Sequence, residues 1–215
     1  MQLFESLKIN FMKLILTSDG LSDENIIKSF RDILGVSVSQ AKALLIAYAQ
    51  TEEEKFFIKA SQTELEQLDI EVSVLNMGDK FDADQLRLDV FQVVYVCGGN
   101  TFAILQQMRV LGVDTLITHH VQNGAVYIGV SAGSIIAGPD IEIAGWGADG
   151  DSNDVQLQDT KGLGFTNVAT FPHFEKEIHT EEVDKFTQKV DYPVQAVPDG
   201  QALIVDEEKV FITKL

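Results

Sequence analysis

The sequence is poor in cysteine, and its single thiol, Cys97, cannot form an internal disulfide. It also lacks an apolar run long enough to span a bilayer, and its first residues lack the basic and apolar pattern of a secretion signal. Chains without disulfides are typical of reducing compartments. These absences lead us to expect a cytoplasmic protein with no membrane partner.

Positive charge is also scarce. The chain has 16 Lys and Arg residues against 33 Asp and Glu residues, which gives a formal net charge of -17. Only three arginines occur, and these are Arg31, Arg87 and Arg109. A surface of this charge repels phosphate backbones and anionic lipids unless a basic stripe offsets it, and the sequence has no such stripe. We therefore expect no nucleic-acid partner and attribute the acidic residues to solubility.

Apolar residues are plentiful enough for a large core. They make up 45% of the chain, and charged residues make up 23%, as in ordinary globular proteins. A length of 215 residues suits one domain better than two. We expect residues 12–215 to form that domain, residues 1–11 to be an N-terminal extension, and the protein to be a monomer or a homodimer.

Short apolar segments alternate with amphipathic ones along the first 130 residues. The pattern predicts strands at residues 12–17, 43–49, 71–75, 92–96 and 125–128. It predicts helices at residues 24–34, 52–68, 102–108 and 114–121, the first with an N-cap at residues 22–24 and a stop at Gly35. This alternation favours an α/β fold, in which a mostly parallel sheet is covered by helices on both faces.

The second half of the chain is less regular. Residues 141–160 are rich in Gly, Asp and Asn, which is typical of a loop. After it we predict a strand at residues 168–171, a helix over about residues 180–190, and a closing hairpin over residues 195–213.

The segment around Ser131 has the pattern of a nucleophile elbow. Residues 129–133 read Gly-Val-Ser-Ala-Gly, directly after the predicted strand 125–128, and residues 134–138 suit the start of a helix. In so sharp a strand-to-helix turn, glycines let the chain pass close to itself and the serine hydroxyl stands clear of the sheet. Ordinary turns contain the same small residues, so the prediction of a serine hydrolase also requires a base.

His173 is the histidine best placed to be that base. It follows the apolar residues 168–172 at the exit of a predicted strand, where α/β sheets place their ligands. A purely structural histidine is the alternative. The other histidines, which we expect at the surface, are His119, His120 and His179. Cys97 has no adjoining histidine and is predicted to be a small buried residue.

Gly98, Gly99 and Asn100 follow the predicted strand 92–96, so they open onto the same sheet edge as the elbow. Paired glycines leave backbone amides free to face a developing oxyanion, and the amide of Ala132 is the second predicted donor. The alternative is a tight turn in which Asn100 or Thr101 caps the next helix. The two roles are compatible, because a helix N-terminus itself favours negative charge.

Five motifs occur in order along the chain. They read Met-Lys-Leu-Ile-Leu-Thr-Ser at 12–18, Gly-Gly-Asn-Thr-Phe at 98–102, Gly-Val-Ser-Ala-Gly-Ser at 129–134, Pro-His-Phe at 172–174 and Pro-Asp-Gly-Gln-Ala at 198–202. In these motifs the chain, from Met12 to near its C-terminus, resembles the peptidase E family of serine peptidases, which includes aspartyl dipeptidase and cyanophycinase. The resemblance implies a fold related to class I glutamine amidotransferases. It also implies hydrolysis of peptide bonds next to an acidic residue, with no metal and no cofactor.

The same resemblance assigns site residues. It implies Ser131 as the nucleophile and His173 as the base, with an acid in the loop between them that completes a triad. The acids of that loop, in order of fit to the family pattern, are Asp154, Asp151 and Asp149. Glu175 is an alternative, because the amidotransferase relatives carry their acid two residues after the histidine.

One family feature is missing from the chain. In aspartyl dipeptidases an arginine shortly after the histidine region is expected to pair with the substrate aspartate. Residues 175–182 here read Glu-Lys-Glu-Ile-His-Thr-Glu-Glu, in which only Lys176 and His179 offer positive charge. The residue that would select an aspartate is therefore absent from its family position.

The residues and the resemblance together predict a serine-type, dipeptidase-like enzyme that hydrolyses short peptides through an acyl-enzyme. Its expected partner is a small peptide, and the resemblance implies an acidic residue at the scissile bond. Two alternatives remain. One is a small esterase with the same order of serine, acid and histidine, although its oxyanion loop normally comes earlier in the chain. The other is a non-catalytic member of the fold that retains the pocket.

Overall fold

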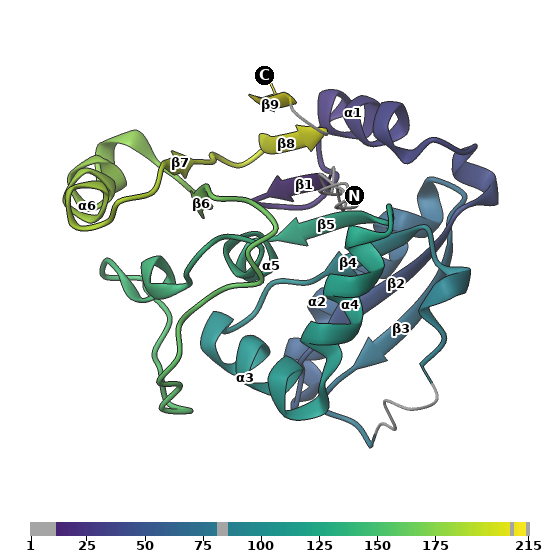
Figure 1. Cartoon of the computed structure of the whole chain (residues 1–215), viewed down its shortest axis with the longest axis horizontal. Helices are drawn as coiled ribbons and strands as arrows, with labels where there is room; N and C mark the ends of the chain where they lie inside the picture. Colours follow the sequence, from purple (N-terminus) through teal and green to yellow (C-terminus); the bar gives the residue numbers. More distant parts are fainter. Residues whose placement is uncertain (1–11, 81–85, 207–208, 214–215) are drawn as a thin grey trace, which may run out of the picture.

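The fold is built on a sheet of seven strands (Figure 1), and the computed structural model describes residues 12–80, 86–206 and 209–213. In spatial order the strands are β3 (Glu71–Asn76), β2 (Lys42–Ala47), β4 (Val93–Val96), β5 (Val126–Val130), β1 (Lys13–Thr17), β8 (Ala202–Asp206) and β9 (Lys209–Ile212). The first five are mutually parallel, and β8 and β9 add an antiparallel hairpin beside β1. The predicted mostly parallel α/β sheet is confirmed.

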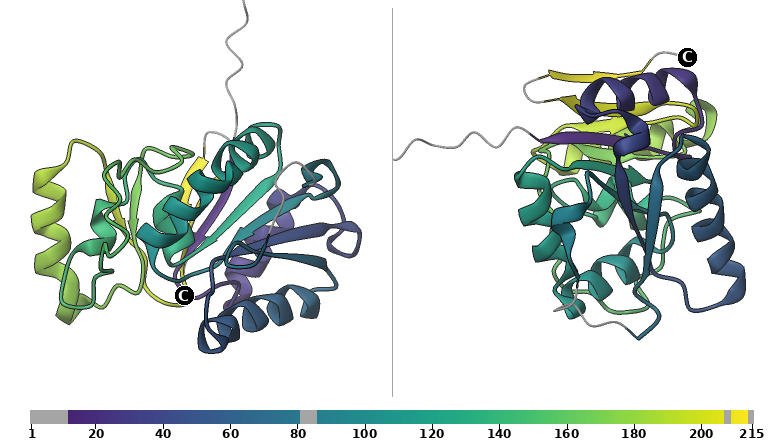
Figure 2. Two further views of the ribbon diagram at one scale, coloured as in Figure 1. Left: turned by 90° about the horizontal axis from the view of Figure 1, so that it is seen from below. Right: turned by 90° about the vertical axis from the view of Figure 1, so that its right-hand side faces the viewer.

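Helices cover both faces of this sheet, as predicted (Figure 2). One face is covered by α1 (Glu24–Leu34) and α2 (Glu52–Gln67), and the other by α3 (Thr101–Leu111), α4 (Val113–Gln122) and α5 (Ala132–Ile136). Successive strand residues point to opposite faces, so on β1 Leu14 and Leu16 join one core cluster and Ile15 joins the other. Burial on both faces explains why the inner strands β2, β4 and β5 are mostly apolar, whereas the edge strand β3 is largely exposed and carries polar residues.

Local sequence signals account for the element ends. The Asp23 side chain accepts a hydrogen bond from the Asn25 amide at the start of α1, and Gly35 ends that helix in the left-handed conformation. Strand β2 ends at Ala47, two residues before the predicted end. The reason is Asn76, whose side chain binds both the amide and the carbonyl of Ala49 and so replaces the strand pairing there.

The second half of the chain departs from the prediction. Strand β6 (Ala169–Phe171) does not join the main sheet but pairs in parallel with β7 (Val194–Ala196), which takes up residues expected in the closing hairpin. Helix α6 (Lys176–Lys189) begins four residues before the predicted start and therefore contains His179. In Figure 1 this unit lies beside the main sheet, next to α5. Short 3-10 turns occupy Val38–Gln40 (η1), Leu88–Val90 (η3) and Glu142–Gly145 (η4).

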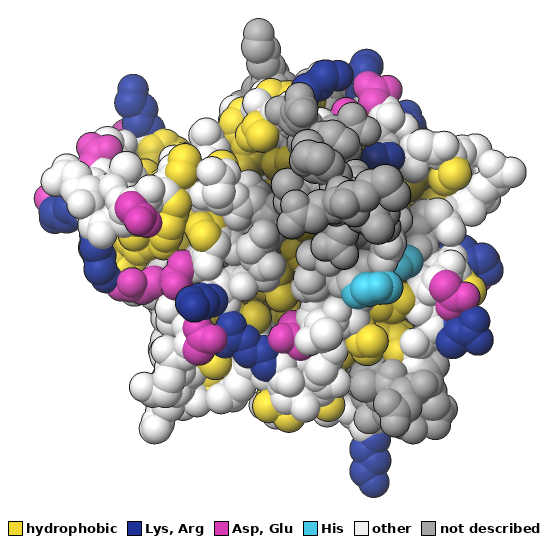
Figure 3. Space-filling view, in the orientation of Figure 1, with side chains coloured by type: hydrophobic (Ala, Val, Ile, Leu, Met, Phe, Trp, Pro, Cys, Tyr) yellow, Lys and Arg dark blue, Asp and Glu magenta, His cyan; other side chains and the backbone are white. Residues whose placement is uncertain are grey.

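The charged side chains on the face shown in Figure 3 are of both signs, and Lys and Arg residues alternate there with Asp and Glu. On the described part of that face they form no broad basic patch of the kind that nucleic acids bind. Within the described ranges, no helix combines the length and the apolar character needed to cross a membrane. The predicted N-terminal extension, residues 1–11, lies outside the described residues.

Candidate active site

Ser131 stands at the junction of β5 and α5 with φ 50° and ψ -110°, a conformation that non-glycine residues rarely adopt. Its amide donates to the carbonyl of Thr17 at 2.9 Å. A Cβ on Gly129 would lie 2.5 Å from the carbonyl oxygen of Gly133, and one on Gly133 would lie 2.3 Å from that of Val96. Both glycines are therefore needed for the close approach, and the predicted strand-to-helix turn is confirmed.

The ring of His173 contacts the serine on one side and a carboxylate on the other. Its Nε2 lies 3.0 Å from Oγ of Ser131, and its Nδ1 lies 2.8 Å from Oδ1 of Asp199. Because a carboxylate only accepts hydrogen bonds, Nδ1 carries the proton and Nε2 is left to accept one. The histidine backbone is also strained, with φ 54°. The arrangement has the connectivity of a nucleophile, a base and an orienting acid.

The acid that contacts His173 is Asp199, and this corrects the placement expected of Asp154. The carboxylate of Asp154 accepts instead from the hydroxyl of Ser152 at 2.8 Å. Asp151 accepts from the amide of Thr101 at 2.8 Å, at the start of α3. The loop that holds both aspartates thus packs on the N-terminus of α3 rather than on the histidine.

The remaining acids that we considered are also away from the ring. Asp149 and Glu175 line a hollow that His173 also lines, but among the described residues neither acid makes a hydrogen bond or ion pair with His173. Asp199 belongs to the Pro-Asp-Gly turn that leads into β8. The signal available in the sequence was an acid in a Pro-Asp-Gly turn just before an apolar segment. Such a turn does not by itself show which side chain the acid contacts.

The two residues that follow β1 hold the histidine and the turn of its acid in place. Ser18 is buried, and its hydroxyl accepts from the amide of His173 at 3.0 Å and donates to the carbonyl of Val197 at 2.6 Å. Asp19 accepts from the amide of Gly200, the residue after the acid, at 3.0 Å. The loop after β1 therefore holds both the histidine and the turn of its acid, which lie 155 and 181 positions further along the chain.

The glycine pair after β4 lies against the elbow, as predicted. A Cβ on Gly98 would be 3.3 Å from that of Ser131, and Gly99 has φ 139°, which L side chains rarely adopt. Asn100 caps α3 through its side-chain oxygen, so the capping role is confirmed. Ala132 is the first residue of α5, where helix amides have no intrahelical acceptor.

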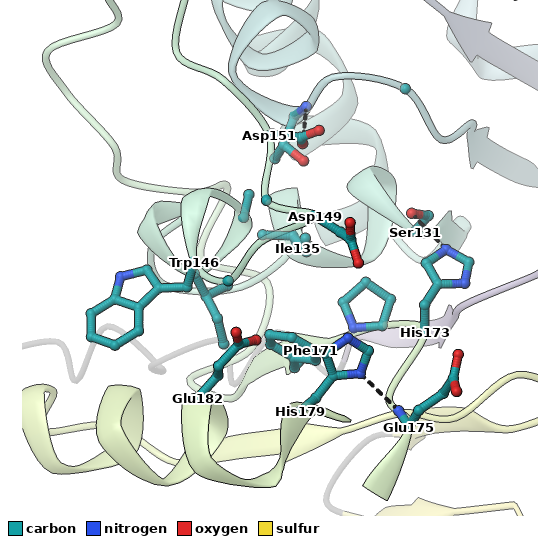
Figure 4. A pocket seen from close by; sticks show the side chains of 17 residues that line it. Ser131, Ile135, Trp146, Asp149, Asp151, Phe171, His173, Glu175, His179 and Glu182 are labelled. Carbon is teal, nitrogen blue, oxygen red and sulfur yellow. Dashed lines mark hydrogen bonds between the residues drawn. The ribbon is translucent and has the colours of Figure 1, made fainter. Parts of the chain in front are cut away.

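Two hollows meet at Ser131 and His173. The first, which we call the Asp149 hollow, has a volume of about 360 Å³ and lies between the loop after η4 and helix α6 (Figure 4). Its lining includes Ile135, Trp146, Asp149, Phe171, His179 and Glu182. The second, which we call the Glu64 hollow, has a volume of about 560 Å³ and lies under α2. Its lining includes Asp19, Phe57, Ala60, Glu64, Tyr95 and Val130.

The Asp149 hollow is acidic. Four carboxylates line it, those of Asp149, Asp151, Glu175 and Glu182, and no described Lys or Arg does. In Figure 4 Asp149 and Glu182 enter it from opposite walls. His179 was expected at the surface but lines this hollow, where its Nδ1 accepts from the amide of Glu175 at 2.9 Å. Its position inside α6, four residues after Glu175, explains the difference.

Cys97 is buried, as predicted, and burial raises the pKa of its thiol to about 12. It is therefore a poor nucleophile at neutral pH. Among the described residues, His, Cys, Asp and Glu side chains form no group of three or more that could hold a metal ion.

Comparison with known sequences places the chain among peptidases. The sequence profile of peptidase family S51 matches residues 14–213. An uncharacterised peptidase of Pasteurella multocida is 26% identical over 204 residues, which are 92% of this chain and 95% of that protein. Another, of Listeria innocua, is 32% identical over 201 residues, which are 87% and 93%. Peptidase E of Escherichia coli is 38% identical over 86 residues, which are 39% of this chain and 34% of that protein.

Comparison with solved structures also finds peptidases. A crystal structure of a candidate peptidase E protein from Listeria monocytogenes superposes with a TM-score of 0.75 and 25% identity, covering 95% of this chain and 98% of that one. A peptidase from an acI-B1 actinobacterium has a TM-score of 0.63 and 18% identity, covering 95% and 91%, and shows likeness of fold alone.

Proposed function

The chain belongs to peptidase family S51, and from that membership we propose that it is a serine-type peptidase that hydrolyses short peptides. The proposed triad is Ser131, His173 and Asp199. The observation that carries the proposal is the double contact of the His173 ring, 3.0 Å to Oγ of Ser131 and 2.8 Å to Oδ1 of Asp199. The site therefore has the geometry of a hydroxyl activated by an oriented base.

In the proposed reaction, Nε2 of His173 accepts the proton of the Ser131 hydroxyl as Oγ attacks the scissile carbonyl carbon. Asp199 holds the ring in the required tautomer and stabilises the imidazolium that forms. The protonated Nε2 then gives its proton to the leaving amine, and the acyl group remains as an ester on Ser131. A water that His173 deprotonates cleaves this ester, which releases the carboxylic acid and restores the serine.

The amides of Gly99 and Ala132 are the proposed donors to the oxyanion. Their support is positional, because Gly98 packs against the serine, Gly99 lines both hollows together with it, and Ala132 follows it directly. Removing one oxyanion donor typically costs about 100- to 1,000-fold in kcat, so these amides carry a large share of the proposed catalysis.

A preference for an acidic residue at the scissile bond gains no support from the lining of the site. The described lining of the Asp149 hollow offers four carboxylates and neither Lys nor Arg. A substrate carboxylate placed there would meet like charges without a guanidinium to pair with. We therefore propose a peptidase whose peptide substrates are not restricted to those with aspartate as their first residue.

The test is labelling with a fluorophosphonate probe, followed by peptide mapping and by assays of dipeptides against p-nitrophenyl esters. We expect the label on Ser131, its loss in Ser131→Ala, and its retention in Ser152→Ala, which alters an exposed serine outside the site. Dipeptides should be cleaved, as well as the more reactive esters, because both substrates acylate Ser131. Undiminished cleavage of peptides by Ser131→Ala would overturn the proposal, and cleavage of esters alone would favour the esterase.

A further inference from the structure

The Glu64 hollow is walled by one face of helix α2. Phe57, Ala60, Ser61 and Glu64 follow one another at intervals of three, one and three residues, which places them in a single row along the helix. The opposite boundary of the hollow is the catalytic edge itself, with Gly98, Gly99, Ser131 and His173. A group bound in this hollow therefore lies next to the proposed nucleophile.

Glu64 forms the polar end of this row, and its carboxylate is held in place. It accepts from the hydroxyl of Tyr95 at 2.8 Å and from the amide of Leu21. A carboxylate offers about four acceptor positions, so two remain for a ligand. Tyr95 is buried, which fixes the direction of the carboxylate. Asp19 also lines the hollow, and no described Lys or Arg does.

The other end of the row is apolar and open. Phe57 is 61% exposed although it lines the hollow, and Ala60 and Val130 extend the same apolar surface. Phe56 is 70% exposed and touches Phe57 edge to face, but it does not line the hollow. The two adjacent phenylalanines therefore differ in their relation to the site while they share a similar exposure.

We propose that the Glu64 hollow is the subsite for one of the two residues that flank the scissile bond, and that it takes a long side chain with an apolar stem and a positively charged end, that of lysine or arginine. The stem would lie along Phe57 and Ala60, and the cationic end would meet the carboxylate of Glu64. This inference rests on the proposed function, because the hollow is defined by its contact with Ser131 and His173.

Charge and shape both favour this occupant over others. An acidic side chain would face Glu64 and Asp19 without a cation among the described lining residues. A purely apolar side chain would fill the Phe57 end but would cover the Glu64 carboxylate without supplying a donor, which is unfavourable for a buried acceptor. Lysine and arginine satisfy both ends, because their methylene stems pack on apolar surface while the charged head pairs.

The experiment measures kcat/KM for two dipeptide series, X-Ala and Ala-X, with X as lysine, norleucine, leucine and aspartate. Norleucine has the methylene stem of lysine without the ammonium, so their ratio isolates the charge. At one of the two positions we expect lysine to exceed norleucine about tenfold and aspartate to be the poorest. Equal rates for lysine and norleucine at both positions would overturn the inference.

Two pairs of variants locate the effect. Glu64→Gln should bring the lysine to norleucine ratio at that position close to one, whereas Glu66→Gln, on the same helix but outside the hollow, should leave it unchanged. Phe57→Ala should lower kcat/KM about fivefold or more for lysine and norleucine alike, and Phe56→Ala should not. The assignment of this subsite is wrong if Glu64→Gln lowers kcat/KM equally for all substrates. It is also wrong if Phe56→Ala lowers kcat/KM as much as Phe57→Ala does.

Binding of the same dipeptides to Ser131→Ala by calorimetry separates this inference from the proposed function. If no peptide is hydrolysed by the wild type but Lys-Ala or Ala-Lys binds about tenfold more tightly than its norleucine counterpart, the peptidase proposal fails and the subsite stands. If peptides are hydrolysed and the binding shows no preference for lysine, the subsite fails alone.

Discussion

Nδ1 of His173 donates to Oδ1 of Asp199 at 2.8 Å, although the two residues are 26 positions apart in sequence. The acid thus follows the histidine along the chain, and the order of the proposed triad is serine, histidine, acid. This order differs from the one expected from the sequence, in which an aspartate of residues 149–154 came between serine and histidine. The same spatial constellation recurs with different chain orders in unrelated proteases, so chain order is not a physical requirement.

Replacement of Asp199 by asparagine should lower kcat about 10³- to 10⁴-fold. The amide can present its nitrogen to the ring, which stabilises the wrong tautomer of His173 and removes the charge that stabilises the imidazolium. The matched control is Asp154→Asn, which should retain wild-type kcat, because among the described residues the carboxylate of Asp154 accepts a side-chain hydrogen bond from Ser152 and makes none with His173. Steady-state assays with one good dipeptide measure both. The opposite ranking of the two variants would restore Asp154 as the orienting acid.

Replacement of Ser18 by alanine should lower kcat about tenfold or more with little change in KM. Its buried hydroxyl binds the amide of His173 and the carbonyl of Val197, so its loss frees the strained histidine backbone. Each buried group left unpaired costs about 1 to 3 kcal/mol, so the free energy of unfolding should also fall. Exposed Ser39 provides the control, since Ser39→Ala should change neither quantity. Wild-type kcat in a folded Ser18→Ala protein would contradict the positioning role.

Replacement of Gly133 by alanine should destabilise the fold by about 2 to 3 kcal/mol or prevent folding. The new Cβ would lie 2.3 Å from the carbonyl oxygen of Val96, which belongs to the interior strand β4 and cannot move without disturbing the sheet. At Gly145 the nearest atom to a new Cβ is 3.4 Å away, so Gly145→Ala should be well tolerated. Urea unfolding followed by circular dichroism compares the two variants, and equal midpoints would contradict the steric argument.

Glu64 should make the stability of the protein depend on pH. Burial raises the pKa of its carboxyl above the ordinary 4.5, against hydrogen bonds from Tyr95 and Leu21 that lower it, and the charge of Asp19 adds to the rise. Between the ordinary and the raised value, the folded state binds more protons than the unfolded state, so the free energy of unfolding falls as pH increases.

Glu64→Gln removes this titration. The free energy of unfolding of the variant, relative to the wild type, should therefore rise with pH across that window and level off above it. Urea titrations at half-unit steps from pH 4 upward measure the difference, and Glu66→Gln should follow the wild type at every pH. A difference that stays constant or falls with increasing pH would contradict the raised pKa.

The sequence allowed good prediction wherever structure follows from neighbouring residues. The inner strands are mostly apolar, α1 has its cap at Asp23 and its stop at Gly35, and the elbow around Ser131 is dictated by glycines with no room for a Cβ. Prediction was poorer after Ser131, where β6 and β7 pair with each other and not with the main sheet. Strand composition does not specify the partner strand, because pairing depends on where the connecting loops carry each segment.

By itself the sequence determined the α/β class, the strand-to-helix turn at Ser131, the glycine pair beside it and the histidine to be paired with it. Each of these depends on local backbone geometry or on the apolar pattern, which the order of residues specifies directly. Only the tertiary structure decided which of many carboxylates meets His173, that His179 faces a hollow, and that one row of α2 overlooks the serine. The reason is that an acid becomes the partner of a base by approaching within hydrogen-bond distance, and that distance is set by the packing of segments far apart in the chain.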